Sequence, residues 1–94
     1  MWIYLKMVLE EKDELLEFMK TFGESPIIGS KQSAIKANNG HRIIVKDSIK
    51  GYIFGEVKYI KRCKTSYDIK GSTGVEMKLS YCNLEKIFVN NKKH

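Results

Sequence analysis

The stretch that decides the fold is residues 51–63, which read GYIFGEVKYIKRC. Its aromatic and β-branched residues favour an extended strand. Because successive side chains of a strand point to opposite faces, we expect Ile53 and Val57 to face a core together. The other face then carries Tyr52, Phe54, Glu56 and Lys58. A bend near Tyr59 would release the basic end of this stretch into solvent.

Four more short strands are expected around this one. They cover residues 42–46, 67–70, 75–81 and 86–89. Alternation of apolar and polar residues is strictest over 75–81. It places inward Val75, Met77, Leu79 and Tyr81. Five short strands with tight connections are expected to curl or close, because so small an open sheet has too little apolar cover.

Residues 1–24 form an acidic strand-helix segment in this interpretation. Residues 1–8, MWIYLKMV, favour a strand, with a helical continuation as the alternative. From Glu10 the period becomes helical, which predicts an amphipathic helix of about three to four turns before Gly23. Glu10, Glu11 and Asp13 would lie in its first turn, near the positive end of the helix dipole. The predicted apolar face carries Leu15, Leu16, Met19 and Phe22.

Residues 25–41 are expected to form a loop or a hairpin. Residues 30–37 fit either a short helix or a strand that turns at Asn38-Asn39-Gly40, and we favour the hairpin because Asn-Gly is a strong turn signal. His41 beside this turn is expected to be exposed and has no partner for general-base work. Gly29-Ser30-Lys31 lacks the spacing of a phosphate-binding loop. Residues 91–94 read as a frayed tail.

Residues 42–90 contain a series of short motifs in a fixed order, namely Asp47-Ser48, Gly51-Tyr52-Ile53-Phe54-Gly55-Glu56-Val57, Tyr67-Asp68-Ile69, Leu79-Ser80 and Asn83-Leu84-Glu85-Lys86-Ile87. In this order they resemble the SH3-like small barrels of the Tudor and KOW type. The resemblance implies that Gly55 lies on a sharply bent second strand, where a residue without Cβ lets the sheet fold over itself. A weaker similarity to PUA-like domains, in Gly29-Ser30-Lys31, Gly40-His41-Arg42-Ile43 and Gly55-Glu56-Val57, brings no active-site set with it.

The predicted fold class is therefore α+β in a single domain of 94 residues. An N-terminal strand and an amphipathic helix are expected to pack on a five-stranded antiparallel SH3-like barrel over residues 42–90. The acidic segment would then cap one open end of the barrel.

Charge is divided unevenly along the chain. Residues 1–24 carry three lysines against six carboxylates, whereas residues 25–94 carry fourteen Lys and Arg against five carboxylates. Positive charge gathered in one folded region attracts polyanions, and its attraction to phosphate is largely independent of sequence. The chain is therefore expected to bind DNA or RNA through the phosphate backbone.

The predicted contacts centre on four cations within seven residues, Lys58, Lys61, Arg62 and Lys64. Cations neutralise phosphates while aromatic rings stack on unpaired bases, so basic residues beside rings suit nucleic acid. The wider predicted set adds Lys46, Lys50, Lys70 and Lys78, with the rings of Tyr52, Phe54 and Tyr67. In the alternative interpretation, these rings fill the core or pack under the helix.

Two other binding functions stay open at this level. The resemblance to Tudor barrels raises an aromatic cage for a methylated cation, built from Tyr52, Phe54, Tyr59 and Tyr67 with Glu56 or Asp68. The excess of positive charge around these residues would repel such a ligand. A protein-binding adaptor or inhibitor is the main alternative, which would dock on a larger complex through a barrel edge or the acidic helix.

No catalytic set, metal site or cofactor is predicted. No His/Glu pair, carboxylate cluster or activated cysteine is spaced for catalysis, so we expect a non-enzymatic protein. Cys63 and Cys82 match no zinc or redox motif and are read as reduced thiols of a cytoplasmic protein. The apolar stretch 1–9 is interrupted by Lys6 and is shorter than the roughly 20 residues that a membrane helix needs. It also lacks the features of a signal peptide, so no membrane partner is expected.

Overall fold

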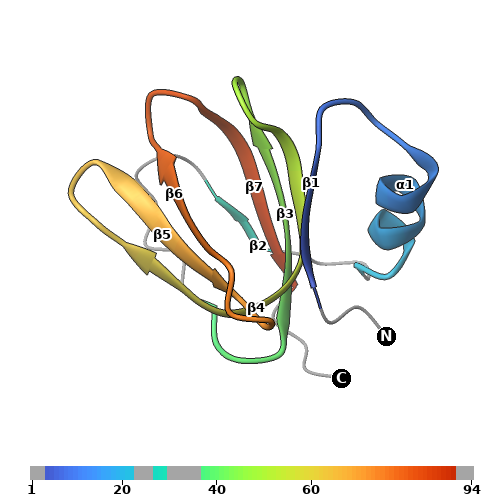
Figure 1. Ribbon diagram of the computed structural model, residues 1–94, viewed down its shortest axis with the longest axis horizontal. Helices are drawn as coiled ribbons and strands as arrows, with labels where there is room; N and C mark the ends of the chain where they lie inside the picture. The colour runs from blue at the N-terminus through green and yellow to red at the C-terminus, as the bar shows by residue number, and fades with distance from the viewer. Residues whose placement is uncertain (1–3, 23–26, 30–36, 91–94) are drawn as a thin grey trace.

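The computed structural model describes residues 4–22, 27–29 and 37–90. These residues form one helix and seven strands: β1 (Leu5–Val8), α1 (Asp13–Lys20), β2 (Ile27–Gly29), β3 (His41–Asp47), β4 (Gly51–Arg62), β5 (Ser66–Gly71), β6 (Glu76–Ser80) and β7 (Leu84–Asn90). The strands pair antiparallel in the order β2-β7-β3-β4-β5-β6, and β1 pairs with β4 (Figure 1). The protein is a mostly β domain with one short helix.

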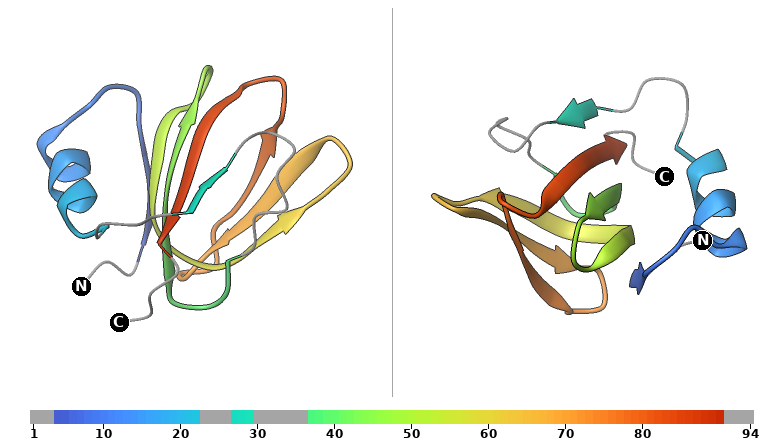
Figure 2. Two further views of the ribbon diagram at one scale, coloured as in Figure 1. Left: turned by 180° about the vertical axis from the view of Figure 1, so that it is seen from behind. Right: turned by 90° about the horizontal axis from the view of Figure 1, so that it is seen from above.

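Strand β4 organises this sheet because two strands share one of its edges. On one edge, β3 pairs with residues 51–57. On the other edge, β1 pairs with residues 52–55 and β5 with residues 57–62. The β5 register shifts between Val57 and Tyr59, so a bulge leaves Lys58 without a β5 residue opposite. The expected bend lies at this bulge, and β5 and β6 lean away to the side opposite α1 (Figures 1 and 2).

Two glycines let β1 pair with β4 at close range. A Cβ on Gly55 would lie 1.8 Å from the Tyr4 carbonyl oxygen, and a Cβ on Gly51 would lie 2.4 Å from that of Val8. Both glycines have positive φ, +146° and +82°. The Tyr4 carbonyl also accepts a hydrogen bond from the Glu56 N–H at 3.2 Å. The absence of a Cβ at both positions therefore permits this close pairing.

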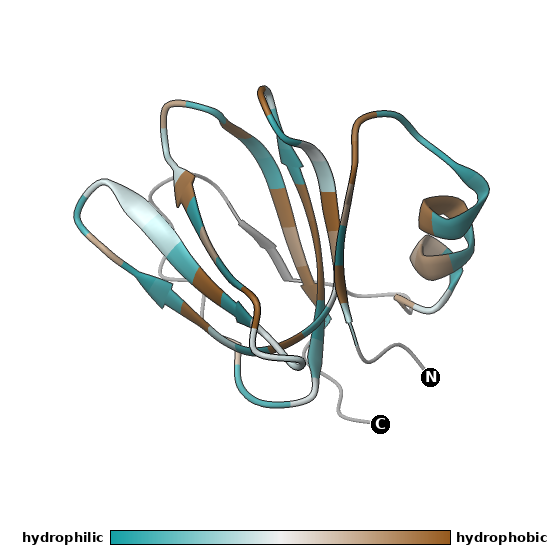
Figure 3. Cartoon of the chain, in the orientation of Figure 1, coloured by the Kyte–Doolittle hydropathy of each residue, from teal (hydrophilic) through white to brown (hydrophobic). Residues whose placement is uncertain are grey.

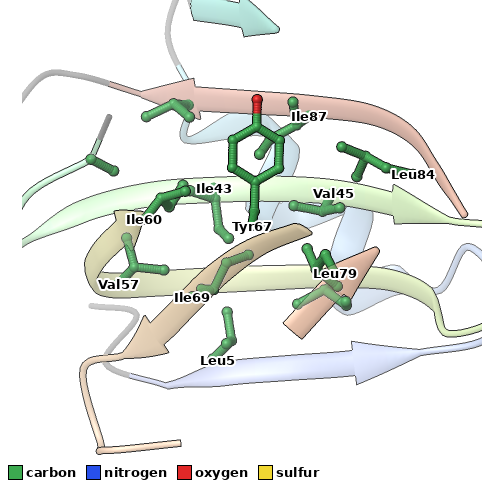
Figure 4. Packing of buried hydrophobic residues seen from close by; sticks show 13 residues of the cluster. Leu5, Ile43, Val45, Val57, Ile60, Tyr67, Ile69, Leu79, Leu84 and Ile87 are labelled. Carbon is green, nitrogen blue, oxygen red and sulfur yellow. The ribbon is translucent and has the colours of Figure 1, made fainter. Parts of the chain in front are cut away.

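The main core fills the space between the two halves of the sheet. Figure 4 shows the Tyr67 ring among aliphatic side chains, and Ile53 and Val57 lie in this cluster as predicted. The whole cluster consists of Leu5, Ala37, Ile43, Val45, Ile53, Val57, Ile60, Tyr67, Ile69, Leu79, Leu84, Ile87 and Val89.

A second apolar cluster lies between α1 and the opposite face of the sheet, where the hydrophobic side of the helix turns inward (Figure 3). Its buried members are Val8, Leu15, Phe18, Phe22, Ile44 and Phe54. Lys6 of β1 and Glu14 of α1 form an ion pair beside it. Hydrogen bonding from Lys6 lowers the pKa of the Glu14 carboxyl. The sheet is thus covered on both faces around β3 and β4.

The helix differs from its prediction in length and in buried face. It has eight residues, so Glu10 and Glu11 precede it and only Asp13 of the three predicted acids lies in its first turn. Leu16 is 44 % exposed, whereas Phe18 is buried. The residues facing the sheet are Leu15, Phe18, Met19 and Phe22. This spacing of three, four and seven residues follows one helical face, and the adjacent pair 15 and 16 does not.

Two other local predictions, for His41 and Val75, are corrected. His41 is buried at the start of β3, and its Nδ1 accepts a hydrogen bond from the Asn38 N–H at 3.1 Å. Val75 precedes β6 and is 44 % exposed, although Leu79 is buried as expected. Residues 27–29, within the segment expected as a loop or hairpin, form β2 and pair with β7. The predictions for residues 1–3, 23–26, 30–36 and 91–94 lie outside the described residues.

Candidate nucleic-acid interface

The end of β4, with β5 and β6, presents a mixed but mainly cationic face away from α1. Pairing across the strands forms two rows on it. One row contains Lys61, Asp68 and Lys78, and the other contains Tyr59, Lys70 and Glu76. We call these six residues the β4–β6 face. Ile60, Ile69 and Leu79 of the same strands point to the core behind it.

The four cations at the centre of the sequence prediction all lie at this part of the molecule. Lys58, Lys61 and Arg62 are exposed on β4, and Lys64 is exposed in the turn to β5. Among the described residues, ion pairs join Lys6 to Glu14 and Lys70 to Glu76. None of these four cations takes part in them. Four positive charges are therefore available to a ligand from solvent.

The wider set of predicted cations divides between two places. Lys70 and Lys78 lie on the β4–β6 face, where Lys70 approaches Glu76 at 3.8 Å. Lys46 lies instead on the α1 side of the sheet, since its neighbours in a groove there include Met19 of α1. Lys50 belongs to the turn between β3 and β4. The structure thus does not gather all eight predicted cations into one patch.

The prediction of base stacking is wrong for two of the three rings, Phe54 and Tyr67, because both are fully buried. Phe54 packs under α1 with its centroid 5.3 Å from that of Phe18. Tyr67 lies in the main core, edge-on to Tyr81 at 5.1 Å. Tyr52 is half-buried on the α1 side. Rings that are this widely separated do not form the aromatic cage considered from the sequence.

Tyr59 is the ring that the β4–β6 face does expose, at 39 %. Simple alternation from Val57 would send it into the core, but the bulge at Lys58 reverses the alternation. Ile60 then points inward and Tyr59 outward. The sequence signal for this change was weak, since no glycine or proline marks the bulge.

Tyr59 borders a shallow depression of about 320 Å³ on this face, also lined by Asp68, Glu76, Met77 and Lys78. Asp68 Oδ2 accepts a hydrogen bond from the Cys63 thiol at 3.4 Å, while Oδ1 is buried without a hydrogen-bond partner. The bond to Asp68 raises the pKa of the Cys63 thiol, which keeps it protonated and poorly nucleophilic. The depression therefore offers one lysine, a ring edge and two carboxylate acceptors for binding.

Comparison with protein-family models, with curated proteins and with solved structures found no match. Within the described residues, no three His, Cys, Asp or Glu side chains gather so as to hold a metal ion. That part of the chain also contains no helix with the length and apolar character to cross a membrane. The site is therefore interpreted from its own geometry.

The burial of Tyr67 leads us to expect that the protein loses stability at alkaline pH. Burial raises the pKa of Tyr67 above its ordinary value of 10.0, and the nearby Tyr81 adds to this effect. The folded protein therefore keeps this proton at a pH where the unfolded chain has released it. Stability is present below about pH 10 and is lost as pH rises through the raised folded pKa. Urea denaturation should show that the free energy of unfolding falls less from about pH 9 to about pH 11 in Tyr67→Phe than in the parent. Equal losses would contradict the assignment.

Proposed function

We propose that this protein is a non-enzymatic module that binds RNA or DNA, mainly through the phosphate backbone. The observation that carries the proposal is the exposed Tyr59 ring among cations on the β4–β6 face. Phosphate neutralisation supplies affinity without sequence readout, and a stacked base adds about 1–3 kcal/mol. Because a ring stacks best on a base that is not already paired, single strands suit this face better than a duplex.

We further propose that β3 to β7 form an SH3-like barrel of the Tudor and KOW type. The order β7-β3-β4-β5-β6 supports this, because β3 and β7, which are the first and last of these five strands in the sequence, are neighbours in the sheet. The long β4, with Gly55 in close pairing with β1 and a bulge at Lys58, supports a sharply bent second strand. β1 and α1 are additions on the outside of such a barrel.

Salt dependence tests the nucleic-acid proposal. We expect the affinity of the parent for a single-stranded oligonucleotide to fall steeply with salt. Lys61→Ala/Lys64→Ala should flatten the slope of log K against log salt by about 1.4, since each phosphate contact contributes about 0.7 on single strands. Fluorescence anisotropy over a salt series would measure both slopes.

The matched control is Lys12→Ala/Lys20→Ala, which removes two exposed lysines from the α1 segment. Both double variants have the same net charge, so a purely nonspecific charge effect would flatten both slopes equally. Equal slopes would place the interface elsewhere. No binding by the parent at low salt would overturn the nucleic-acid proposal altogether.

In that last case a protein-binding module becomes the better proposal, and one surface favours it. Leu9 and Ile49 are 75 % and 68 % exposed. Leu9 and Ile49 lie near each other at one end of the molecule. Gly51, which follows shortly after Ile49, lies directly against Leu9. Exposed apolar side chains gathered at one place are typical of protein contacts.

A further inference from the structure

A second cationic feature lies on the α1 side of the sheet, where two lysines face each other across adjacent strands. Lys46 of β3 is paired directly with Lys86 of β7 and, on its other side, with Tyr52 of β4. Lys86 and its neighbour Phe88 were not among the residues predicted from the sequence. β7 lies beside β3 only in the folded sheet.

These two lysines lie opposite each other without a direct ion pair to a carboxylate among the described residues. Neither lysine is in an ion pair there. Lys46 Nζ lies 5.5 Å from the centroid of the Tyr52 ring, which keeps this amine near the ring. Glu11, the nearby carboxylate, accepts a hydrogen bond from the Tyr52 hydroxyl at 3.1 Å. Like charges opposite each other destabilise an antiparallel pair, and a bound anion would relieve the repulsion.

The lysines border a groove between α1 and the sheet that also has an apolar lining. The groove has a volume of about 220 Å³ and is lined by Glu11, Met19, Lys46, Tyr52, Lys86 and Phe88. Met19 and Phe88 are half-buried, so each has surface left for a ligand. An aromatic ring and a thioether form a surface suited to a flat ring. The groove thus combines a site for a ring with a site for a doubly charged anion.

We propose that this groove binds one nucleotide, with its base against Phe88 and its phosphate between Lys46 and Lys86. Residues directly opposite in an antiparallel pair have Cα atoms only about 4.5–5.5 Å apart, so both amines can reach one phosphate. The nucleotide is either free or part of a single strand. The proposal deepens the proposed function but does not need the β4–β6 face, because α1 and the strands β5 and β6 lie on opposite sides of the molecule, with the main core between them (Figure 1).

The experiment is a titration of ¹⁵N-labelled protein with adenosine monophosphate, adenosine and inorganic phosphate, followed by amide chemical shifts. We expect the monophosphate to shift the amides of Lys46, Lys86 and Phe88 at concentrations where neither half of the ligand does so. Shifts of equal size with inorganic phosphate would reduce the groove to an anion site and overturn the proposal. Shifts confined to other residues would overturn it as well.

Variants make the test specific to the groove. Lys46→Met and Lys86→Met keep most of the side-chain stem and remove the charge, so each should weaken nucleotide binding about tenfold. Lys50→Met is the matched control, since Lys50 does not line the groove. Both groove variants should unfold at no lower temperature than the parent, because each removes one of two facing like charges. Unchanged binding by Lys86→Met would contradict the proposal.

Two further measurements distinguish a free nucleotide from a nucleic-acid strand as the ligand and test the two proposals separately. A short single-stranded oligoadenylate that shifts the groove amides at lower concentration than the monophosphate identifies a strand as the natural ligand. Tighter binding of the monophosphate identifies the free nucleotide. Lys61→Ala/Lys64→Ala should leave the groove shifts unchanged, so loss of binding on the β4–β6 face and loss of binding in the groove can be told apart.

Discussion

Replacing Gly55 by alanine is expected to lower the free energy of unfolding by about 3 kcal/mol, since backbone strain and overpacking each cost about 1–3 kcal/mol. Gly55 has φ +146°, and the added Cβ would lie 1.8 Å from the Tyr4 carbonyl oxygen. That atom is backbone and cannot rotate away, so β1 must move off β4. The same carbonyl accepts the Glu56 N–H bond, which would be lost in the move. The midpoint of thermal unfolding should fall by about 12–24 °C.

Gly74→Ala is the matched control for this change. Gly74 also has positive φ, +98°, but nothing lies within 4 Å of an added Cβ. It should therefore cost only the backbone strain of about 1–2 kcal/mol. Thermal and urea unfolding of both variants would measure the difference. If the two variants lose the same stability, the close pairing of β1 with β4 is not present in solution.

Strand β4 links the fold to the proposed function. Its first half carries the glycines that allow β1 to pair closely with it. Its second half carries Tyr59 and the cations that form no ion pair among the described residues. The bulge at Lys58 separates these halves and turns Tyr59 to solvent. The residues that bend the sheet thus also decide which ring a single strand would meet.

Much of the sheet followed from the sequence, because short-range rules decide it. Alternation correctly assigned Ile53 and Val57 to the core, and turn residues correctly separated the strands from β3 to β7. The assignment of Phe54 failed because its face of β4, expected to be open, is covered by α1. Alternation states which residues share a face, but not whether another element packs on that face.

The candidate sites were harder to predict for a related reason. The cations on β4 are close together in sequence and were found directly. The groove joins residues of α1, β3, β4 and β7, which come together only through the strand order. Tyr59 needed knowledge of a bulge that no glycine or proline marks. Pairing over long sequence separations therefore limited the prediction of sites more than the prediction of strands.

Phe18→Ala is expected to lower the free energy of unfolding by about 3–5 kcal/mol, the usual cost of emptying a large buried aromatic site. Phe18 is fully buried, and its ring centroid lies 5.8 Å from that of Phe22 and 5.3 Å from that of Phe54. It joins α1 to the sheet at the centre of the second cluster. Loss of this ring should release α1 and lower the helical signal in circular dichroism before the sheet unfolds.

Leu16→Ala is the control on the same helix, and it decides between the two assignments of the buried face. Leu16 is 44 % exposed, so its truncation should cost only about 0.5 kcal/mol. The face predicted from the sequence, with Leu16 inward and Phe18 outside the buried set, requires the reverse order. A larger loss of stability for Leu16→Ala than for Phe18→Ala would therefore mean that α1 is rotated about its axis. Met19 belongs to both faces, so such a rotation would shift its side chain in the groove that it lines with Phe88 but would not turn it to solvent, and the comparison therefore also tests the geometry of that wall.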